Sequence, residues 1–200
     1  CQGCELWTSK TRICYAGILT ERYGGRPGWP DSFDKPKIFP ERIAKSCAWP
    51  DMRGVIRPDK PWIKPSTPRL IFLDDMGDTF TEGLPIDWLM PHIPAMENGP
   101  HIWQFLTKRP KRMAQFFDML GYVPKNFWLG TSVTDQRTAD ARIPHLIGIK
   151  NCTRFISAEP LFGQVSLSQW LTRWPVDTEN GRIYKPFHWL IAGGMSGNNR

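Results

Sequence analysis

The fold is decided by one stretch, residues 102–121, which reads IWQFLTKRPKRMAQFFDMLG. Its first five residues are apolar with a single interruption, as in a strand that is buried on both faces of a parallel sheet. Polar residues follow, and Pro110 then suits the first turn of a helix. Apolar residues recur at helical spacing up to Leu120, and Gly121 suits the helix end. The stretch therefore predicts one strand–loop–helix unit.

Similar apolar runs of strand length occur at four other places, residues 70–73, 127–129, 154–156 and 189–192. Neighbouring runs start roughly 25 to 35 residues apart, which is the length of a βα unit. We therefore predict an α/β fold, a parallel (β/α) barrel that is partial or complete and TIM-barrel-like.

The segments between these runs predict further helices. One covers about residues 136–143 and ends near Pro144, and a shorter one covers 167–174. A weaker helical pattern follows Leu84, where Pro91 and Pro94 interrupt it.

Residues 24–68 differ in composition, with nine prolines and the pair Gly24-Gly25. This proline density excludes long helices and central strands. We expect an irregular segment over one mouth of the barrel, with at most one short helix near residues 41–45. Because the chain starts at Cys1 and stops after a glycine-rich turn, we expect residues 1–200 to be a single barrel domain truncated at both ends.

The net charge of +7 favours an anionic partner such as nucleic acid, a phosphate or a nucleotide. A solvated basic surface explains the same charge equally well. No apolar run reaches the roughly 18 residues of a membrane span, and no secretory leader is visible, so we expect a cytoplasmic protein without a membrane partner.

Polar or small residues follow every predicted strand. The five clusters are Asp74-Asp75-Met76-Gly77-Asp78, Thr107-Lys108-Arg109, Gly130-Thr131-Ser132, Ser157-Ala158-Glu159-Pro160 and Gly193-Gly194-Met195-Ser196. Parallel strands of a barrel end at one shared rim, so these clusters predict a polar, ligand-sized site. A structural alternative is that Ser132, Thr134 and Asp135 simply cap the following helix.

Glu159 stands out because Ala158 and Pro160 enclose it at a strand end. Its carboxylate suits a general base, a hydrogen-bond acceptor for substrate, or an ion pair with Lys108 or Arg109. Gly193-Gly194 would let a ligand approach the backbone closely.

Three cysteines lie within the first fourteen residues, at Cys1, Cys4 and Cys14. In a reducing compartment such a cluster indicates a metal site rather than disulfides. Three thiolates suit an iron–sulfur cluster with one open iron, or zinc with one further ligand, for which Cys47 is a candidate. Cys152 precedes a strand and is expected to be a small buried hydrophobe.

The motifs along the whole chain resemble a poorly characterised family spread among phages and bacteria, marked by a three-cysteine motif and similar to radical S-adenosylmethionine (SAM) enzymes. The residues that carry the resemblance are Gly3-Cys4, Cys14-Tyr15-Ala16, Pro40-Glu41-Arg42, residues 69–80, Leu106-Thr107-Lys108-Arg109-Pro110, residues 128–133, residues 139–144, residues 155–161 and residues 193–197.

The resemblance implies a radical-SAM-like fold, a [4Fe–4S] cluster held by three cysteines, and SAM on the open iron. Electron transfer would then cleave SAM to a carbon radical that abstracts hydrogen from substrate. On this reading Cys1, Cys4 and Cys14 are the cluster ligands. Glu159, Lys108 and Asp78 are the catalytic candidates, and the pocket is lined by Thr107, Arg109, Ser132, Ser157, Gly193 and Gly194.

The sequence departs from the family pattern at several of these positions. Thr11 stands where the family has a cysteine, and Met195 where it has a glutamate. The family's Val-Glu-Asn reads Val133-Thr134-Asp135 here, and of its Asn-Ser-Met-Ser-Asp only the methionine and the last carboxylate, Asp78, are kept.

Three hypotheses follow. The first is a phage-associated, radical-SAM-like enzyme that acts on a nucleotide or nucleic acid. The second is a zinc-stabilised phage protein that binds nucleic acid or protein without redox catalysis, which Thr11 favours. The third is a metal-dependent hydrolase built on Asp74, Asp75 and Asp78.

Overall fold

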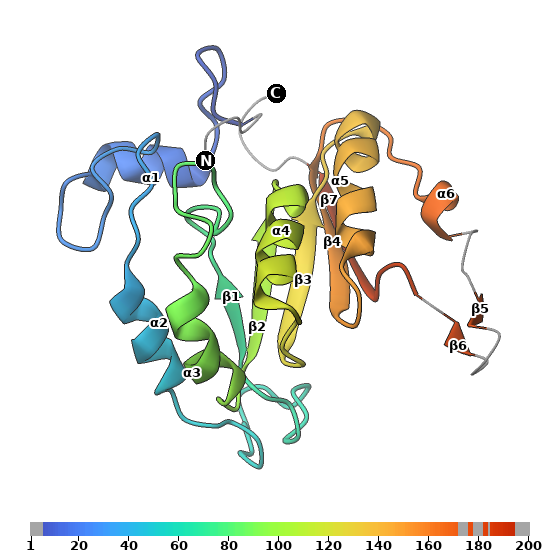
Figure 1. Ribbon diagram of the computed structural model, residues 1–200. Helices are drawn as coiled ribbons and strands as arrows, with labels where there is room; N and C mark the ends of the chain where they lie inside the picture. The colour runs from blue at the N-terminus through green and yellow to red at the C-terminus, as the bar shows by residue number, and fades with distance from the viewer. Residues whose placement is uncertain (1–5, 172–175, 178–181, 184, 195–200) are drawn as a thin grey trace. The chain divides into compact units, whose positions relative to one another are not determined.

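The computed structural model describes residues 6–171, 176–177, 182–183 and 185–194 (Figure 1). Its elements, in chain order, are α1 (Tyr15–Tyr23), α2 (Pro40–Cys47), β1 (Leu70–Leu73), the 3₁₀ helix η1 (Met90–His92), α3 (Ile93–Glu97), β2 (Ile102–Thr107), α4 (Pro110–Leu120), β3 (Phe127–Ser132), α5 (Gln136–Gly148), β4 (Thr153–Leu161), α6 (Ser168–Leu171), β5 (Val176–Asp177), β6 (Arg182–Ile183) and β7 (Trp189–Gly194).

Five strands form one sheet in the order β1-β2-β3-β4-β7. The pairs β1–β2, β3–β4 and β4–β7 are parallel, and a helix follows each of β2, β3 and β4 in the chain. The predicted parallel α/β fold is therefore confirmed. The described residues contribute five strands to this sheet, fewer than the eight of a complete (β/α) barrel. A separate antiparallel pair, β5–β6, was not predicted.

The chain divides into two compact units, which we describe separately. Unit 1 comprises residues 1–105 and 124–127, and unit 2 comprises residues 106–123 and 128–200. In unit 1 the rings of Phe105 and Phe127 pack with centroids 5.0 Å apart. The carbonyl oxygen of Met96, in α3, accepts hydrogen bonds from the side chains of Trp103 (3.1 Å) and Asn126 (2.9 Å). The buried Trp103 contact attaches α3 to β2, and the Asn126 contact attaches α3 to the segment before β3.

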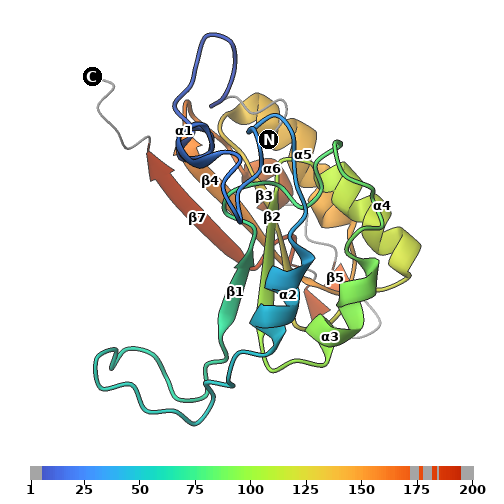
Figure 2. The ribbon, with the colours of Figure 1, turned by 90° about the vertical axis from the view of Figure 1, so that its left-hand side faces the viewer.

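In unit 2, α4 and α5 pack side by side (Figure 2), and their buried faces include Met113, Phe116, Ile143 and Leu146. The neighbouring strands β3 and β4 are joined through close packing at Gly130. A Cβ atom there would lie 2.4 Å from the ring of Phe155, so only glycine lets this ring lie against β3.

The strand predictions are confirmed in position, but burial on both faces holds only for the inner strands. β2, β3 and β4 are largely buried. The terminal strands of the sheet, β1 and β7, expose much of their surface, including Phe72 (43%) and Leu190 (43%). A strand at a sheet edge has a neighbour on one side only, which the apolar pattern does not reveal.

Helix α4 has the predicted bounds, whereas α5 continues past Pro144 to Gly148. The prediction that it ends near Pro144 was wrong. Its last turn is held by Arg154 from β4, whose guanidinium donates to the carbonyls of Ile147 (3.2 Å) and Ile149 (2.6 Å). Such donors satisfy carbonyls that a helix end leaves without partners.

The remaining helix predictions were partly correct. α2 extends the predicted 41–45 helix at both ends, and α1 was not predicted. Pro91 and Pro94 lie in the first turns of η1 and α3, so they start short helices instead of interrupting one long helix. Of the helix predicted at 167–174, the structure describes α6, and residues 172–175 lie outside the described part. No helix among the described residues combines the length and apolar character that a membrane span needs.

Candidate functional site

The polar ends of three strands lie level with one another in unit 2. In the parallel register, Ser132 of β3 pairs with Ser157 of β4, and Ser157 pairs with Ile191 of β7. Glu159 follows two residues later on β4, and the register brings Gly194 opposite Leu161. The predicted convergence at one rim is thus present within this unit. We call residues 107–109, 132, 157, 159, 193 and 194 the unit 2 rim.

The rim is fixed to the end of β2 by two threonines. The Thr131 hydroxyl donates to the carbonyl of Thr107 (2.8 Å), and the Thr107 hydroxyl accepts from the backbone N–H of Arg109 (2.9 Å). Both threonines are buried, whereas Lys108 and Arg109 are half-buried. Thr107, which the sequence predicted to line the pocket, therefore has a structural role. It holds the turn that carries Lys108 and Arg109.

Glu159 lies directly against Gly193. A Cβ atom at Gly193 would lie 2.9 Å from Glu159 Oε1 and 3.0 Å from Cδ. The space that Gly193 leaves is thus filled by the Glu159 side chain, whereas no described atom lies within 4 Å of a Cβ placed on Gly194. Glu159 is exposed, and no hydrogen bond or ion pair to another described residue holds its carboxylate. An ion pair with Lys108 or Arg109, one of the three roles considered for Glu159, does not occur among the described residues.

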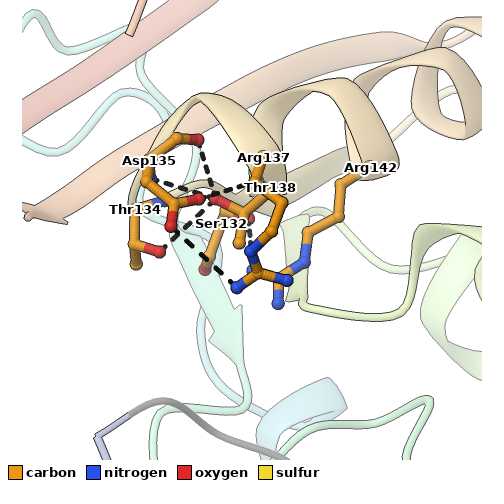
Figure 3. A network of polar contacts seen from close by, with 6 residues as sticks. All are labelled: Ser132, Thr134, Asp135, Arg137, Thr138 and Arg142. Carbon is orange, nitrogen blue, oxygen red and sulfur yellow. Dashed lines mark hydrogen bonds and ion pairs between the residues drawn. The ribbon is translucent and has the colours of Figure 1, made fainter. Parts of the chain in front are cut away.

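Ser132 belongs to a network that caps α5 (Figure 3). Asp135 is the N-cap, and its carboxylate accepts from the backbone N–H of Thr138 (2.7 Å). The Thr138 hydroxyl accepts in return from the backbone N–H groups of Thr134 (2.9 Å) and Asp135 (3.0 Å). Arg142 donates to the Ser132 carbonyl (3.0 Å). The structural alternative, in which this cluster caps the helix, is confirmed for Asp135 alone, because Thr134 and Ser132 contribute backbone groups to the network and no side-chain cap.

In unit 1, the start of α1 lies against the end of β1. The phenol of Tyr15 donates to the carbonyl of Asp75 (2.6 Å), and Cys14 is the buried N-cap of the same helix. Burial raises the pKa of Tyr15, and the negative charges of Asp75, Cys14 and Asp74 raise it further. A cysteine, a phenol and two carboxylates therefore gather at the end of one strand.

Asp74 is the most strongly perturbed carboxyl group in this part of unit 1. Burial, and then repulsion from Asp78 and Asp75, raises the pKa of Asp74 to about 7. Its Oδ1 atom is inaccessible to solvent and accepts no hydrogen bond from the described residues. Asp78 itself is buried, and its Oδ1 accepts from the backbone N–H of Phe80 (3.0 Å), so it shapes the turn after β1.

A hairpin precedes Cys14. Trp7 and Arg12 form an antiparallel bridge, and the carbonyl of Leu6 accepts from the backbone N–H groups of Ile13 (3.0 Å) and Cys14 (3.1 Å). Thr11 lies in the turn, where its N–H donates to the Thr8 hydroxyl (3.0 Å). The hairpin thus returns the chain so that Cys14 lies beside Leu6.

The remaining metal-site predictions rest on a few residues. Cys1 and Cys4, like Met195 and Ser196, lie outside the described residues. Within the described ranges, no three His, Cys, Asp or Glu residues are placed to hold a metal ion, and this includes Asp74, Asp75 and Asp78. Cys47 and Cys152 are half-buried, and burial raises the pKa of Cys152 to about 11.

The sequence placed Asp74 in the first polar cluster and in the hydrolase hypothesis, and it gave Tyr15 no role beyond the family resemblance. The sequence feature that pointed to Asp74 was its position directly after a strand, the same position that the other polar clusters have. Its contact with Tyr15 connects residues 60 positions apart and has no local signal.

In a comparison with protein families, the model described as "Protein of unknown function (DUF5131)" matches residues 1–200. Neither the curated proteins nor the solved structures give a match.

Proposed function

We propose that this chain, which belongs to the DUF5131 family of proteins of unknown function, is a radical-SAM-like iron–sulfur enzyme. In this proposal Cys4, Cys14 and Cys1 hold a [4Fe–4S] cluster. We also propose that the parallel α/β fold is a (β/α) barrel of the radical-SAM type.

The observation that carries the proposal is the hairpin between residues 6 and 14. Nine residues separate Cys4 from Cys14 in sequence, but the Cys14 N–H donates to the carbonyl of Leu6. Leu6 is two residues from Cys4, so chain connectivity keeps the Cα atoms of these two residues within about 7 Å. The hairpin therefore permits two thiolates to share one cluster although Thr11 replaces the family's cysteine.

The surroundings of Cys14 fit a thiolate ligand. Cys14 is the N-cap of α1, a helix of nine residues, where the positive end of the helix dipole favours an anion. Ala16 and Phe33 pack with Cys14 in an apolar cluster, which shields a ligand sulfur from solvent.

When bound, such a cluster supplies the electron that reductively cleaves SAM, and the protein positions the reactants. In the proposal, the exposed Glu159 carboxylate accepts hydrogen bonds from an amine or hydroxyl of SAM or substrate. Lys108 and Arg109 bind carboxylate or phosphate oxygens. Ser157 and the backbone at Gly194 complete this binding surface of unit 2. In unit 1, Asp78 keeps the turn after β1 in place.

Anaerobic purification and reconstitution with iron and sulfide test the proposal. The wild-type protein should bind both elements and absorb broadly in the visible region, and Cys14→Ser should lose most of the iron and this absorption. Cys152→Ser is the matched control, because this half-buried thiol lies in unit 2 and should leave the iron content unchanged.

Two outcomes would overturn the proposal. One is wild-type protein that holds zinc but neither iron nor sulfide, which would favour the zinc-stabilised binding protein. The other is equal iron content in wild-type and Cys14→Ser protein, which would show that the iron is bound elsewhere.

A further inference from the structure

The longest irregular segment of unit 1 connects α2 to β1 and covers residues 48–69 (Figure 2). Loops of more than about 15 residues without regular structure are uncommon in compact domains and are often functional. We call residues 49–69 the proline loop. It carries five Lys or Arg residues against two Asp, a net charge of +3.

Three consecutive turns give this loop a defined shape. The N–H of Lys60 donates to the carbonyl of Arg57 (3.0 Å), that of Ile63 to Lys60 (3.0 Å), and that of Thr67 to Lys64 (2.9 Å). The second residue of each turn is a proline, whose fixed φ suits that position. The Gly54 N–H also donates to the carbonyl of Pro65 (2.7 Å), which ties the two branches of the loop together.

Each of the three turns begins with a basic residue, Arg57, Lys60 or Lys64. The other two cations of the loop are already engaged. Arg53 is paired with Asp51 (2.7 Å), and the Arg69 guanidinium lies 5.2 Å from the centroid of the Trp49 ring. Within the described residues, Lys60 and Lys64 have no ion-pair partner, and both are exposed.

Trp62 lies between these two lysines, at the third position of the middle turn, and 75% of its surface is exposed. A flat indole is thus presented to solvent with one cation two residues before it and another two residues after it. A nucleotide in a single strand has the matching chemistry, because its flat base lies between two phosphates. Duplex bases are stacked on each other and offer no such face.

We propose that the proline loop binds single-stranded nucleic acid, with Trp62 stacking on a base and Lys60 and Lys64 contacting the adjacent phosphates. The prolines restrict the loop before binding, so less conformational entropy is lost on association. Stacking on an exposed aromatic residue gives little base preference, and the lysines read phosphate, so binding should depend weakly on sequence and strongly on salt.

Fluorescence anisotropy with labelled oligo(dT), measured on metal-free protein at low salt, tests the proposal separately from the iron–sulfur chemistry. Trp62→Ala should weaken binding by roughly 5- to 150-fold, the effect of about 1–3 kcal/mol per stacked base. Trp62→Phe should retain most of the affinity. Phe162→Ala is the matched control, because this residue is also exposed (45%) but lies in unit 2.

The salt dependence tests the two lysines. The double variant Lys60→Gln/Lys64→Gln should reduce the slope of log K against log salt by about 1.4, or about 0.7 for each lost phosphate contact. Lys111→Gln/Lys125→Gln removes the same charge from exposed positions elsewhere and should leave the slope unchanged. Thermal unfolding of each variant shows whether it remains folded.

Three results would overturn the proposal. These are absence of oligo(dT) binding by wild-type protein at low salt, equal affinity of wild-type and Trp62→Ala protein, and stronger competition by duplex DNA than by oligo(dT). A blue shift of Trp fluorescence with phosphatidylserine vesicles, but none with oligo(dT), would instead assign the loop to a membrane surface.

Discussion

The Glu159 carboxylate occupies the position that a side chain on Gly193 would take, with Oε1 2.9 Å from the Cβ position. Gly193→Ala must therefore displace the Glu159 side chain. Because Glu159 is exposed and its carboxylate end is flexible, we expect the free energy of unfolding to change by less than about 1 kcal/mol.

Binding should respond more strongly than stability. On the proposed function, Gly193→Ala and Glu159→Gln should both weaken SAM binding several-fold in calorimetric titrations of protein reconstituted with iron and sulfide. Gly163→Ala is the control, since no described atom lies within 4 Å of its Cβ position. Unchanged SAM affinity in both rim variants would remove Glu159 from the proposed SAM-binding site.

Gly130→Ala should destabilise unit 2, because the added methyl group would lie 2.4 Å from the buried Phe155 ring. Overpacking of this kind typically raises the free energy of the folded state by about 1–3 kcal/mol. Urea unfolding should show this loss, and Phe155→Leu in the Gly130→Ala background should restore part of it. Gly148→Ala, at a position with open space, should be neutral or slightly stabilising.

Asp135→Ala should destabilise the protein by about 1 kcal/mol, because it removes the N-cap of α5. Asp135→Asn should retain most of the stability, since the amide oxygen still accepts from Thr138. The hydrogen bonds from Thr138 hold the pKa of Asp135 below its ordinary value. Its charge therefore contributes stability above the unfolded pKa of about 3.9, and this contribution is lost as pH falls through the folded pKa. The wild-type protein should therefore lose its stability advantage over Asp135→Ala as the pH is lowered. An advantage in the free energy of unfolding that stays the same in acid would contradict this account.

Asp74 should show the opposite pH dependence, because its pKa is raised to about 7 in the folded protein. Folding favours the protonated form of Asp74. The contribution of this carboxyl group to the free energy of unfolding is therefore complete below the unfolded pKa of about 3.9 and is lost as pH rises through about 7. Asp74→Asn should therefore be more stable than wild type above pH 7 by about 2 kcal/mol, allowing for partial exposure.

Chemical denaturation across the pH range measures this difference. The advantage of Asp74→Asn should decrease between neutral and acid pH. Parallel pH profiles for the two proteins would show that Asp74 ionises normally in the folded state.

The sequence predicted the parts of the fold that depend on local pattern. Continuous apolar runs located the strands, and Pro110 and Gly121 located both ends of α4. The end of α5 could not be predicted, because the group that holds its last carbonyls is Arg154 from the following strand. The exposure of β7 depends likewise on its place at the edge of the sheet.

The candidate site followed the same division. The polar clusters that follow the strands predicted the unit 2 rim, because the carboxyl ends of neighbouring parallel strands lie at the same edge of a sheet. The raised pKa of Asp74 depends on burial and on neighbouring charges, and the filled space at Gly193 depends on the rotamer of Glu159. Neither has a sequence pattern. The cap formed by Asp135 was weighed only as an alternative, because the same polar residues suit a ligand and a helix end.

The three turns that place a proline after Arg57, Lys60 and Lys64 also affect the susceptibility of the loop to proteolysis. Exposed basic loops are ordinarily where trypsin-like enzymes nick a folded protein. These enzymes cut poorly when proline follows the basic residue, so the arrangement that holds these three cations in place also slows cleavage after each of the three.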